Sequence, residues 1–203
     1  YKDAVSACIA DQTTAGLDIL TDGDMRFEMD IGGRDWFGHV YDRMGGIEDS
    51  AIRSLPFGGS PREEQAGDIF HEIMVSRLPP RVVGPVDAGN LEYDVIWKIA
   101  QALSAKPVKF GACSAQLVDM LVINEFYKSR EDTIMALSEA KNTAYHYVAD
   151  ANCPIIQIEE PCFHFVEDTE WEVSPELYVE AFNKEIRGLR DKTEVWCHTC
   201  WGN

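Results

Sequence analysis

The fold is decided by residues 154–161, which read PIIQIEEP: an apolar run that turns acidic at its end. Isoleucine favours strands, and a run of this length suits a short strand that is buried in a sheet. The two glutamates and the proline that follow favour a sharply turned, rigid loop. We therefore expect a buried strand over 154–158 that closes on Glu159 and Glu160.

The same pattern recurs on both sides of this strand. Short apolar runs at 17–20, 81–86, 108–111 and 194–200 alternate with segments of helical periodicity at 2–16, 93–103, 115–127, 129–149 and 174–189. Ser129 and Ser174 stand where helix N-caps are expected, and Pro175 suits the first helical position. Short buried strands that alternate with helices predict βαβ units and a parallel sheet.

The residues able to do chemistry fall where the expected strands end. They are Asp22, Asp24, Asp87, Cys113, Ser114, Glu159, Glu160, His198 and Cys200. In a (β/α) barrel these strand ends converge on one face, which carries the active site. The sequence thus predicts an α/β fold, a (β/α)8 TIM-type barrel, of which this chain carries about five of the roughly eight strands.

Residues 1–203 are expected to form one partial barrel domain with a long loop insertion at about 25–80. The chain starts on Tyr1 within a helical pattern, so we expect a cut there, with at least one strand before it and two after Asn203. A partial barrel needs a partner, such as a second copy in a homo-oligomer, to cover its edges. The insertion is rich in glycine and proline with interspersed aromatics, which favours a functional loop.

The composition excludes several classes of function. A net charge of −17 repels phosphate backbones, so nucleic-acid binding is not expected. No apolar run reaches the roughly 20 residues of a membrane helix, and no glycine-rich phosphate loop follows a strand. The six cysteines lack the spacing of a disulfide framework, which favours a reducing, cytoplasmic setting.

His198 and Cys200 are candidate metal ligands. They lie two residues apart on an expected strand, so their side chains point to the same side. An imidazole and a thiolate are natural ligands of zinc, which takes about four in all. The alternative is a polar strand end with a hydrogen-bonded histidine and a buried cysteine.

Two acid clusters follow expected strands, Asp22 with Asp24 and Glu159 with Glu160. Their carboxylates could bind an amino group, orient a ligand or act as acid and base. The alternative is that they cap helix N-termini. Arg26 follows the first cluster and could simply pair with it.

Three segments together resemble one family. Residues 16–24, GLDILTDGD, with Arg26 and Asp30, resemble the "GxDxxxDGE…R…D" segment of the catalytic domain of cobalamin-independent methionine synthases. Residues 157–161, QIEEP, resemble its "QIDEP" strand end, and the pair His198 and Cys200 resembles its zinc-binding "HxC". The motifs occur in the family's order and span nearly the whole chain.

The resemblance implies a zinc barrel that transfers a methyl group from 5-methyltetrahydrofolate or a related donor to the thiol of homocysteine, giving methionine. It implies His198 and Cys200 as metal ligands, with a glutamate and a second cysteine beyond the end of this chain. Asp24 and Glu159 match the family's catalytic-site acids that hold the amino group of the substrate. Asp22 and Arg26 stand beside them as further substrate-binding candidates.

Two departures leave the substrate open. Asp24 stands where the family has glutamate, and Glu159 where it has aspartate. Relatives of this zinc barrel alkylate other thiols, as the epoxide:coenzyme M transferases do, so such thiol alkylation is one alternative. The other is a non-catalytic binding module that keeps the barrel shell without metal.

Overall fold

The computed structural model describes residues 1–27, 38–48, 80–161, 163 and 173–199. Helices and strands alternate along this part of the chain. They are α1 (Lys2–Thr14), η1 (Met25–Phe27), α2 (Gly38–Tyr41), β1 (Gly45–Glu48), β2 (Arg81–Asp87), α4 (Tyr93–Ala102), β3 (Phe110–Cys113), α5 (Ala115–Met120), β4 (Ile123–Asn124), α6 (Arg130–Asp150), β5 (Ile155–Glu159), α7 (Pro175–Glu185), η5 (Leu189–Asp191) and β6 (Glu194–His198).

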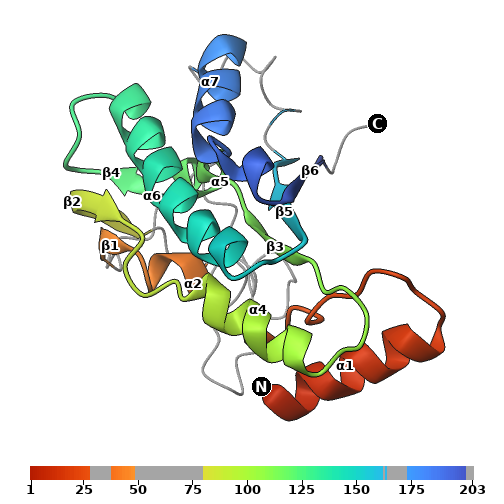
Figure 1. Ribbon diagram of the computed structural model, residues 1–203. Coiled ribbons are helices and arrows are strands. Elements are labelled where there is room, and N and C mark those ends of the chain that lie inside the picture. Colours follow the sequence, from red (N-terminus) through yellow and green to blue (C-terminus); the bar gives the residue numbers. More distant parts are fainter. Residues whose placement is uncertain (28–37, 49–79, 162, 164–172, 200–203) are drawn as a thin grey trace, which may run out of the picture.

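A parallel sheet with the order β3-β5-β6 forms one side of the molecule (Figure 1). Its register places Cys113 opposite Glu159, and Glu159 opposite His198, so the three strands end level with one another. Leu20 adds a parallel bridge to Val108 just before β3. The predicted α/β architecture with parallel strands is confirmed, although the strand expected at 17–20 is reduced to this bridge.

A second sheet, with the order β1-β2-β4, lies on the other side of α6 (Figure 1). Strand β1 pairs antiparallel with β2 and falls inside the stretch expected to be a loop; most of that stretch lies outside the described residues. Strand β4 interrupts the helix expected over 115–127, because Ile123 N donates to Pro80 O at 2.9 Å and Glu125 N donates to Val82 O at 3.0 Å. The prediction of a single sheet is therefore wrong for β2, which belongs to the second sheet.

Helix α6 organises the core between the two sheets. It contacts α4, α5, α7, β2 and β5, and its buried face includes Leu137, Ala144, Tyr145 and Val148. Its first turn is capped as predicted, with Ser129 Oγ accepting from Asp132 N at 3.0 Å. Among the helices that the structure describes, none has the length and apolar character needed to cross a membrane.

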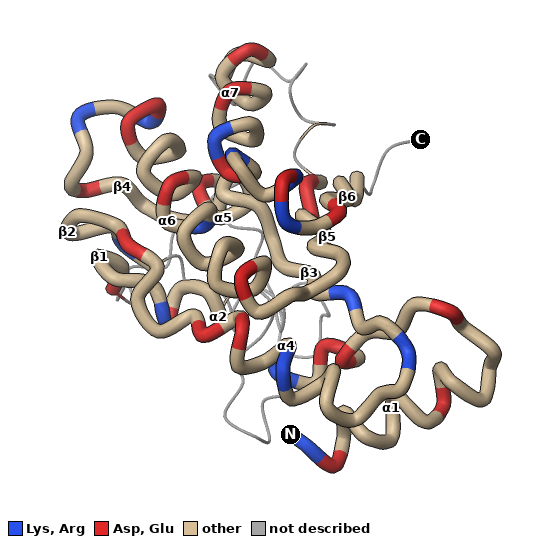
Figure 2. The backbone as a smooth tube through the Cα atoms, in the orientation of Figure 1, with Lys and Arg blue, Asp and Glu red and all other residues tan. Residues whose placement is uncertain are grey.

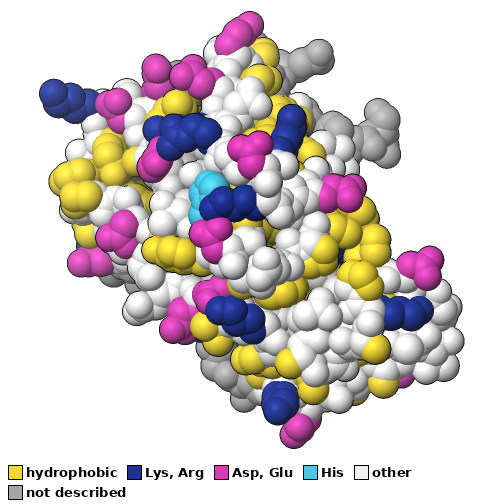
Figure 3. All heavy atoms as spheres, viewed as in Figure 1, with side chains coloured by type: hydrophobic (Ala, Val, Ile, Leu, Met, Phe, Trp, Pro, Cys, Tyr) yellow, Lys and Arg dark blue, Asp and Glu magenta, His cyan; other side chains and the backbone are white. Residues whose placement is uncertain are grey.

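The acidic residues of the described part of the chain are spread over its surface. Figure 2 shows acidic residues on helices, strands and loops alike, and Figure 3 shows acidic side chains scattered over one face. Dispersed charge of this kind is typical of solvated helix faces, so it identifies no ligand by itself.

Candidate active site

The loop 21–27 is held against β3 by a buried ion pair. Arg26 Nη1 lies 2.6 Å from Asp22 Oδ2, and Arg26 Nη2 donates to the carbonyl oxygen of Gly111 at 2.5 Å. The hydroxyl of Tyr1 donates to the same Asp22 oxygen at 3.1 Å. Asp22 and Arg26 are each 6% exposed. The pairing of Arg26 with the first acid cluster therefore fastens residues far apart in sequence.

Asp24 lies on the same loop, with its Oδ1 3.2 Å from Arg26 Nη2. Its φ of 56° lies in the left-handed region, where its backbone N–H donates to Asp22 Oδ1 at 3.1 Å. The pKa of Asp24 is raised, first by reduced hydration of the carboxylate, while Arg26 lowers it and the charges of Asp22 and Glu159 raise it further. The side chain is nevertheless 68% exposed, which leaves it available to a ligand.

Glu159 closes β5 and belongs to a hydrogen-bonded series on the same face of the sheet. Lys109 Nζ donates to Gln157 Oε1 at 2.6 Å, and Gln157 Nε2 donates to Glu159 Oε1 at 2.7 Å. The Lys109 ammonium also lies 5.1 Å from the centre of the Trp196 ring on β6. Lys109 and Gln157 were not among the predicted site residues; the alternation of side chains along β3 and β5 was the available signal.

His198 is the last residue of β6 and is exposed. Its carbonyl oxygen accepts a hydrogen bond from Glu160 N at 2.7 Å, which joins the ends of β5 and β6. Cys200, the other predicted ligand, lies outside the described residues. Within the described ranges, no group of three or more histidine, cysteine or acidic side chains is arranged to hold a metal ion.

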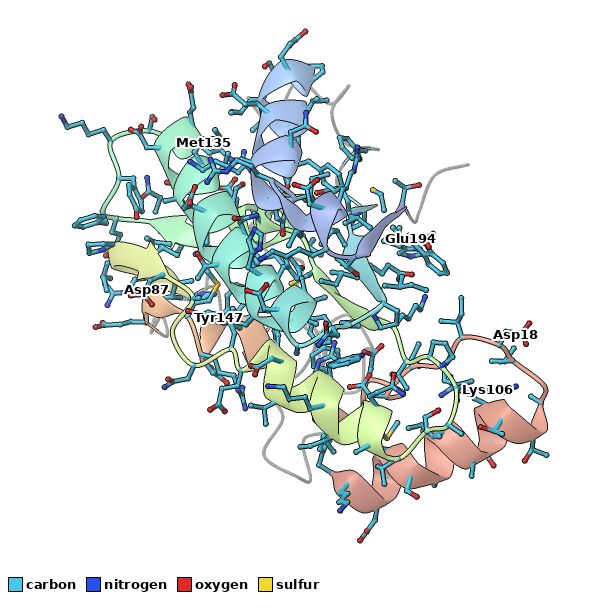
Figure 4. All side chains as sticks on the ribbon, viewed as in Figure 1. Asp18, Asp87, Lys106, Met135, Tyr147 and Glu194 are labelled. Carbon is cyan, nitrogen blue, oxygen red and sulfur yellow. The ribbon has the colours of Figure 1, made fainter. Side chains whose placement is uncertain are left out.

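The other residues predicted at strand ends have structural roles or lie on other elements. Ser114 caps α5, accepting from Leu117 N at 3.1 Å, and burial raises the pKa of the Cys113 thiol to about 11. Glu160 is fully buried. Asp87 ends β2 in the other sheet and lies far from Glu194 of β6 (Figure 4). Because β2 pairs with β1 and β4, Asp87 shares no pairing strand with Glu159 or His198 among the described residues, and its place on a common face stays a prediction.

Comparison with known proteins gives a consistent set of relatives. No model of a known protein family matches the chain. A methionine synthase from Saccharolobus islandicus (strain L.S.2.15) is 26% identical over 204 residues, covering 100% of this chain and 52% of the relative. One from Sulfolobus acidocaldarius is 24% identical over 212 residues, covering 100% of this chain and 51% of the relative. The chain thus spans about half the length of the curated relatives it matches.

Solved structures show the same relationship in the fold. The B12-independent methionine synthase from Shewanella sp. W3-18-1, in complex with selenomethionine, matches 99% of this chain and 51% of its own, with a TM-score of 0.67 and 22% identity. A proposed B12-independent methionine synthase from Listeria monocytogenes matches 99% of this chain and 54% of its own, with a TM-score of 0.71 and 15% identity. Along its whole length the chain is thus similar in sequence to methionine synthases, and its fold matches about half of two solved structures of this kind.

Proposed function

We propose that this chain carries part of the active site of a zinc-dependent methyltransferase. Its reaction would methylate the thiol of homocysteine, with 5-methyltetrahydrofolate or a related compound as donor. The observation that carries the proposal is the register of β5 and β6, which sets Glu159 opposite His198 at the strand ends, with the charge of Glu159 also acting on Asp24. The match to methionine synthases along the whole chain supports it. Residues 1–203 would act as one partial-barrel catalytic domain.

The two acids suit the amino group of an amino-acid substrate. The charge of Glu159 contributes to the raised pKa of Asp24, because like charges disfavour the charged form. An ammonium group beside both would relieve this repulsion and donate charge-assisted hydrogen bonds to them. Asp22 and Arg26 are buried and bonded to each other, so in this proposal they hold the loop and the ammonium binds to Asp24 and Glu159.

The side chains at the end of β6 fit a zinc ion. The His198 ring makes no hydrogen bond to any described residue and is exposed, so a ring nitrogen is available as a ligand. Cys200 would add a thiolate two residues further on. Bound zinc would lower the pKa of the substrate thiol and so supply a thiolate at neutral pH. His198 and Cys200 would hold the ion while Asp24 and Glu159 fix the amino group.

A second candidate reaction is alkylation of coenzyme M by an epoxide. Its sulfonate is an anion and the molecule has no amino group. The negative charges of Asp24 and Glu159 would repel such a thiol, which favours homocysteine.

The cellular setting is part of the same proposal. The described cysteines Cys8, Cys113, Cys153 and Cys197 are free thiols. A reducing compartment such as the cytoplasm would keep them so. A homo-oligomer would bring a second copy to the open edge of the sheet.

Zinc content and thiol methylation test the proposal together. After exhaustive dialysis under reducing conditions, we expect about one zinc ion per chain, lost in His198→Ala and Cys200→Ser. The matched control is Cys197→Ser, which replaces an exposed neighbouring cysteine and should keep the metal. Assays would compare homocysteine plus methyl donor with coenzyme M plus epoxide. Absence of zinc after reconstitution would leave a metal-free binding module, and full activity in Cys200→Ser would exclude a zinc mechanism that uses this thiolate.

A further inference from the structure

We infer that Lys109 and Gln157 are positioning residues that hold the Glu159 carboxylate in place for its ligand. The role of Glu159 toward an amino group rests on the proposed function, but the positioning itself rests on geometry alone. The three side chains form one continuous series of hydrogen bonds across β3 and β5, with donor–acceptor distances of 2.6 and 2.7 Å.

The strand register explains why these side chains meet. Gly111 of β3 lies opposite Gln157 of β5, and both glutamine and Glu159 lean over the glycine. A methyl group added at Gly111 would lie 3.4 Å from Glu159 Oε1 and 3.9 Å from Gln157 Cβ. Lys109 sits two residues before Gly111, hence on the same face of the strand. The missing side chain at Gly111 leaves the space in which the series forms.

The first member of the series is itself held from two sides. Lys109 Nζ donates to Gln157 Oε1 and lies 5.1 Å from the centre of the Trp196 ring. A cation over an aromatic face is attracted by the ring quadrupole, so Trp196 restricts where the ammonium can rest. The ammonium in turn fixes which end of the Gln157 amide faces Glu159, because only the oxygen can accept from lysine.

In this orientation the two carboxylate oxygens of Glu159 have different partners. Oε1 accepts from the Gln157 amide, whose N–H is polarised by the lysine bound at its oxygen. Oε2 accepts no hydrogen bond from any described residue, so it is the oxygen left to a ligand. Lys109 and Gln157 therefore set the direction in which Glu159 presents its free oxygen.

Crystal structures of variants test the positioning without any ligand. In Gln157→Leu and Lys109→Met we expect the Glu159 carboxylate to leave its place over Gly111 or to occupy more than one rotamer. In Lys109→Arg, which keeps both the charge and the donor, we expect it to stay. An unchanged Glu159 in Gln157→Leu would overturn the inference. Lys98→Met, which removes an exposed lysine paired with Asp94, is the matched control and should leave the site unaltered.

Binding then separates positioning from a general structural effect. The probes are homocysteine and 4-mercaptobutyrate, which lacks only the amino group. Lys109→Met and Gln157→Leu should lower the preference for homocysteine about tenfold, which corresponds to about 1.4 kcal/mol, and Lys109→Arg should restore it. Equal weakening of both ligands would overturn the positioning role. A wild-type protein that does not distinguish the two ligands would contradict the proposed function, while the crystal structures still decide the positioning.

Discussion

Two lysine–glutamate sets lie in different surroundings of the same molecule. Among the helices, Lys141 of α6 and Glu185 of α7 are both 0% exposed. Lys141 Nζ donates to Tyr93 Oη at 2.8 Å, and Ala115 N donates to both Glu185 oxygens at 3.1 and 3.2 Å. On the sheet, Lys109 and Glu159 are joined through Gln157, and one Glu159 oxygen is left open.

The difference shows how burial separates a structural charge from one that can bind a ligand. The buried set is enclosed by protein on every side and fastens α4, α5, α6 and α7 together. The set on the sheet keeps access to solvent and an unused acceptor. The same residue types therefore predict opposite outcomes when they are changed: loss of stability among the helices, and loss of binding or activity on the sheet.

The largest effect is expected from Lys141→Met. The change leaves Tyr93 without its donor and removes the buried cation that lowers the pKa of Glu185. We expect the free energy of unfolding to fall by about 3–5 kcal/mol, measured by urea denaturation. The control Lys98→Met, at an exposed ion pair, should change it by less than about 0.5 kcal/mol. Equal losses of stability in the two variants would contradict the distinction between the buried and the exposed lysine.

The next effect is a dependence of stability on pH. Burial, with a smaller contribution from Glu160, raises the pKa of Glu185 from 4.5 to about 8, although Lys141 lowers it. The folded protein then keeps a proton that the unfolded chain releases between these values. The stability linked to this group is therefore complete below pH 4.5 and lost as the pH rises through 8.

We expect the free energy of unfolding to fall by about 3–4 kcal/mol between pH 5 and pH 8. Glu185→Gln should flatten that slope, because the amide is neutral throughout. Chemical denaturation at several pH values measures both proteins. A slope that is the same with and without the substitution would mean that Glu185 is ionised at neutral pH in the folded state.

On the sheet, Glu159→Gln should act on activity and not on stability. Loss of the charge-assisted bond to an amino group should lower kcat/KM for homocysteine about 30-fold, or about 2 kcal/mol. The free energy of unfolding should change by less than about 0.5 kcal/mol. The control Glu125→Gln replaces an exposed carboxylate paired with Arg81. Unfolding of the Glu159 variant under assay conditions would mean that Glu159 is needed for stability, as the buried charges are.

The smallest effect concerns His39, which is 3% exposed and whose ring nitrogens make no hydrogen bond to a described residue. Burial, with the charges of Arg43, Arg26 and Lys141, lowers its pKa from 6.5 to about 3. Stability from the neutral ring is present above pH 6.5 and lost as the pH falls toward 3. His39→Phe should therefore reduce the loss of stability between pH 6.5 and 4.5 by about 1–2 kcal/mol. Thermal unfolding at the two pH values checks this, and an unchanged loss would contradict it.

The elements that the sequence predicted well are those whose signals are local. Ser129 and Ser174 cap α6 and α7 by accepting from the backbone N–H three residues on, at 3.0 and 3.2 Å. The isoleucines at 155, 156 and 158 suffice to predict β5, because a short apolar run is typical of a buried strand. The strand ends bearing Glu159 and His198 followed from the same patterns.

Tertiary structure alone decided the contacts between distant segments. The pairing of β4 with β2, the bond from Arg26 to Gly111 O, and the bond from Lys109 to Gln157 each join residues 42 or more positions apart. Burial of Lys141 and Glu185 likewise depends on helices that pack only in the complete core. A local pattern determines which face a side chain takes and where a helix begins. The partner of a side chain across the sheet or core depends on strand register and helix packing, because those contacts form only when separate elements meet.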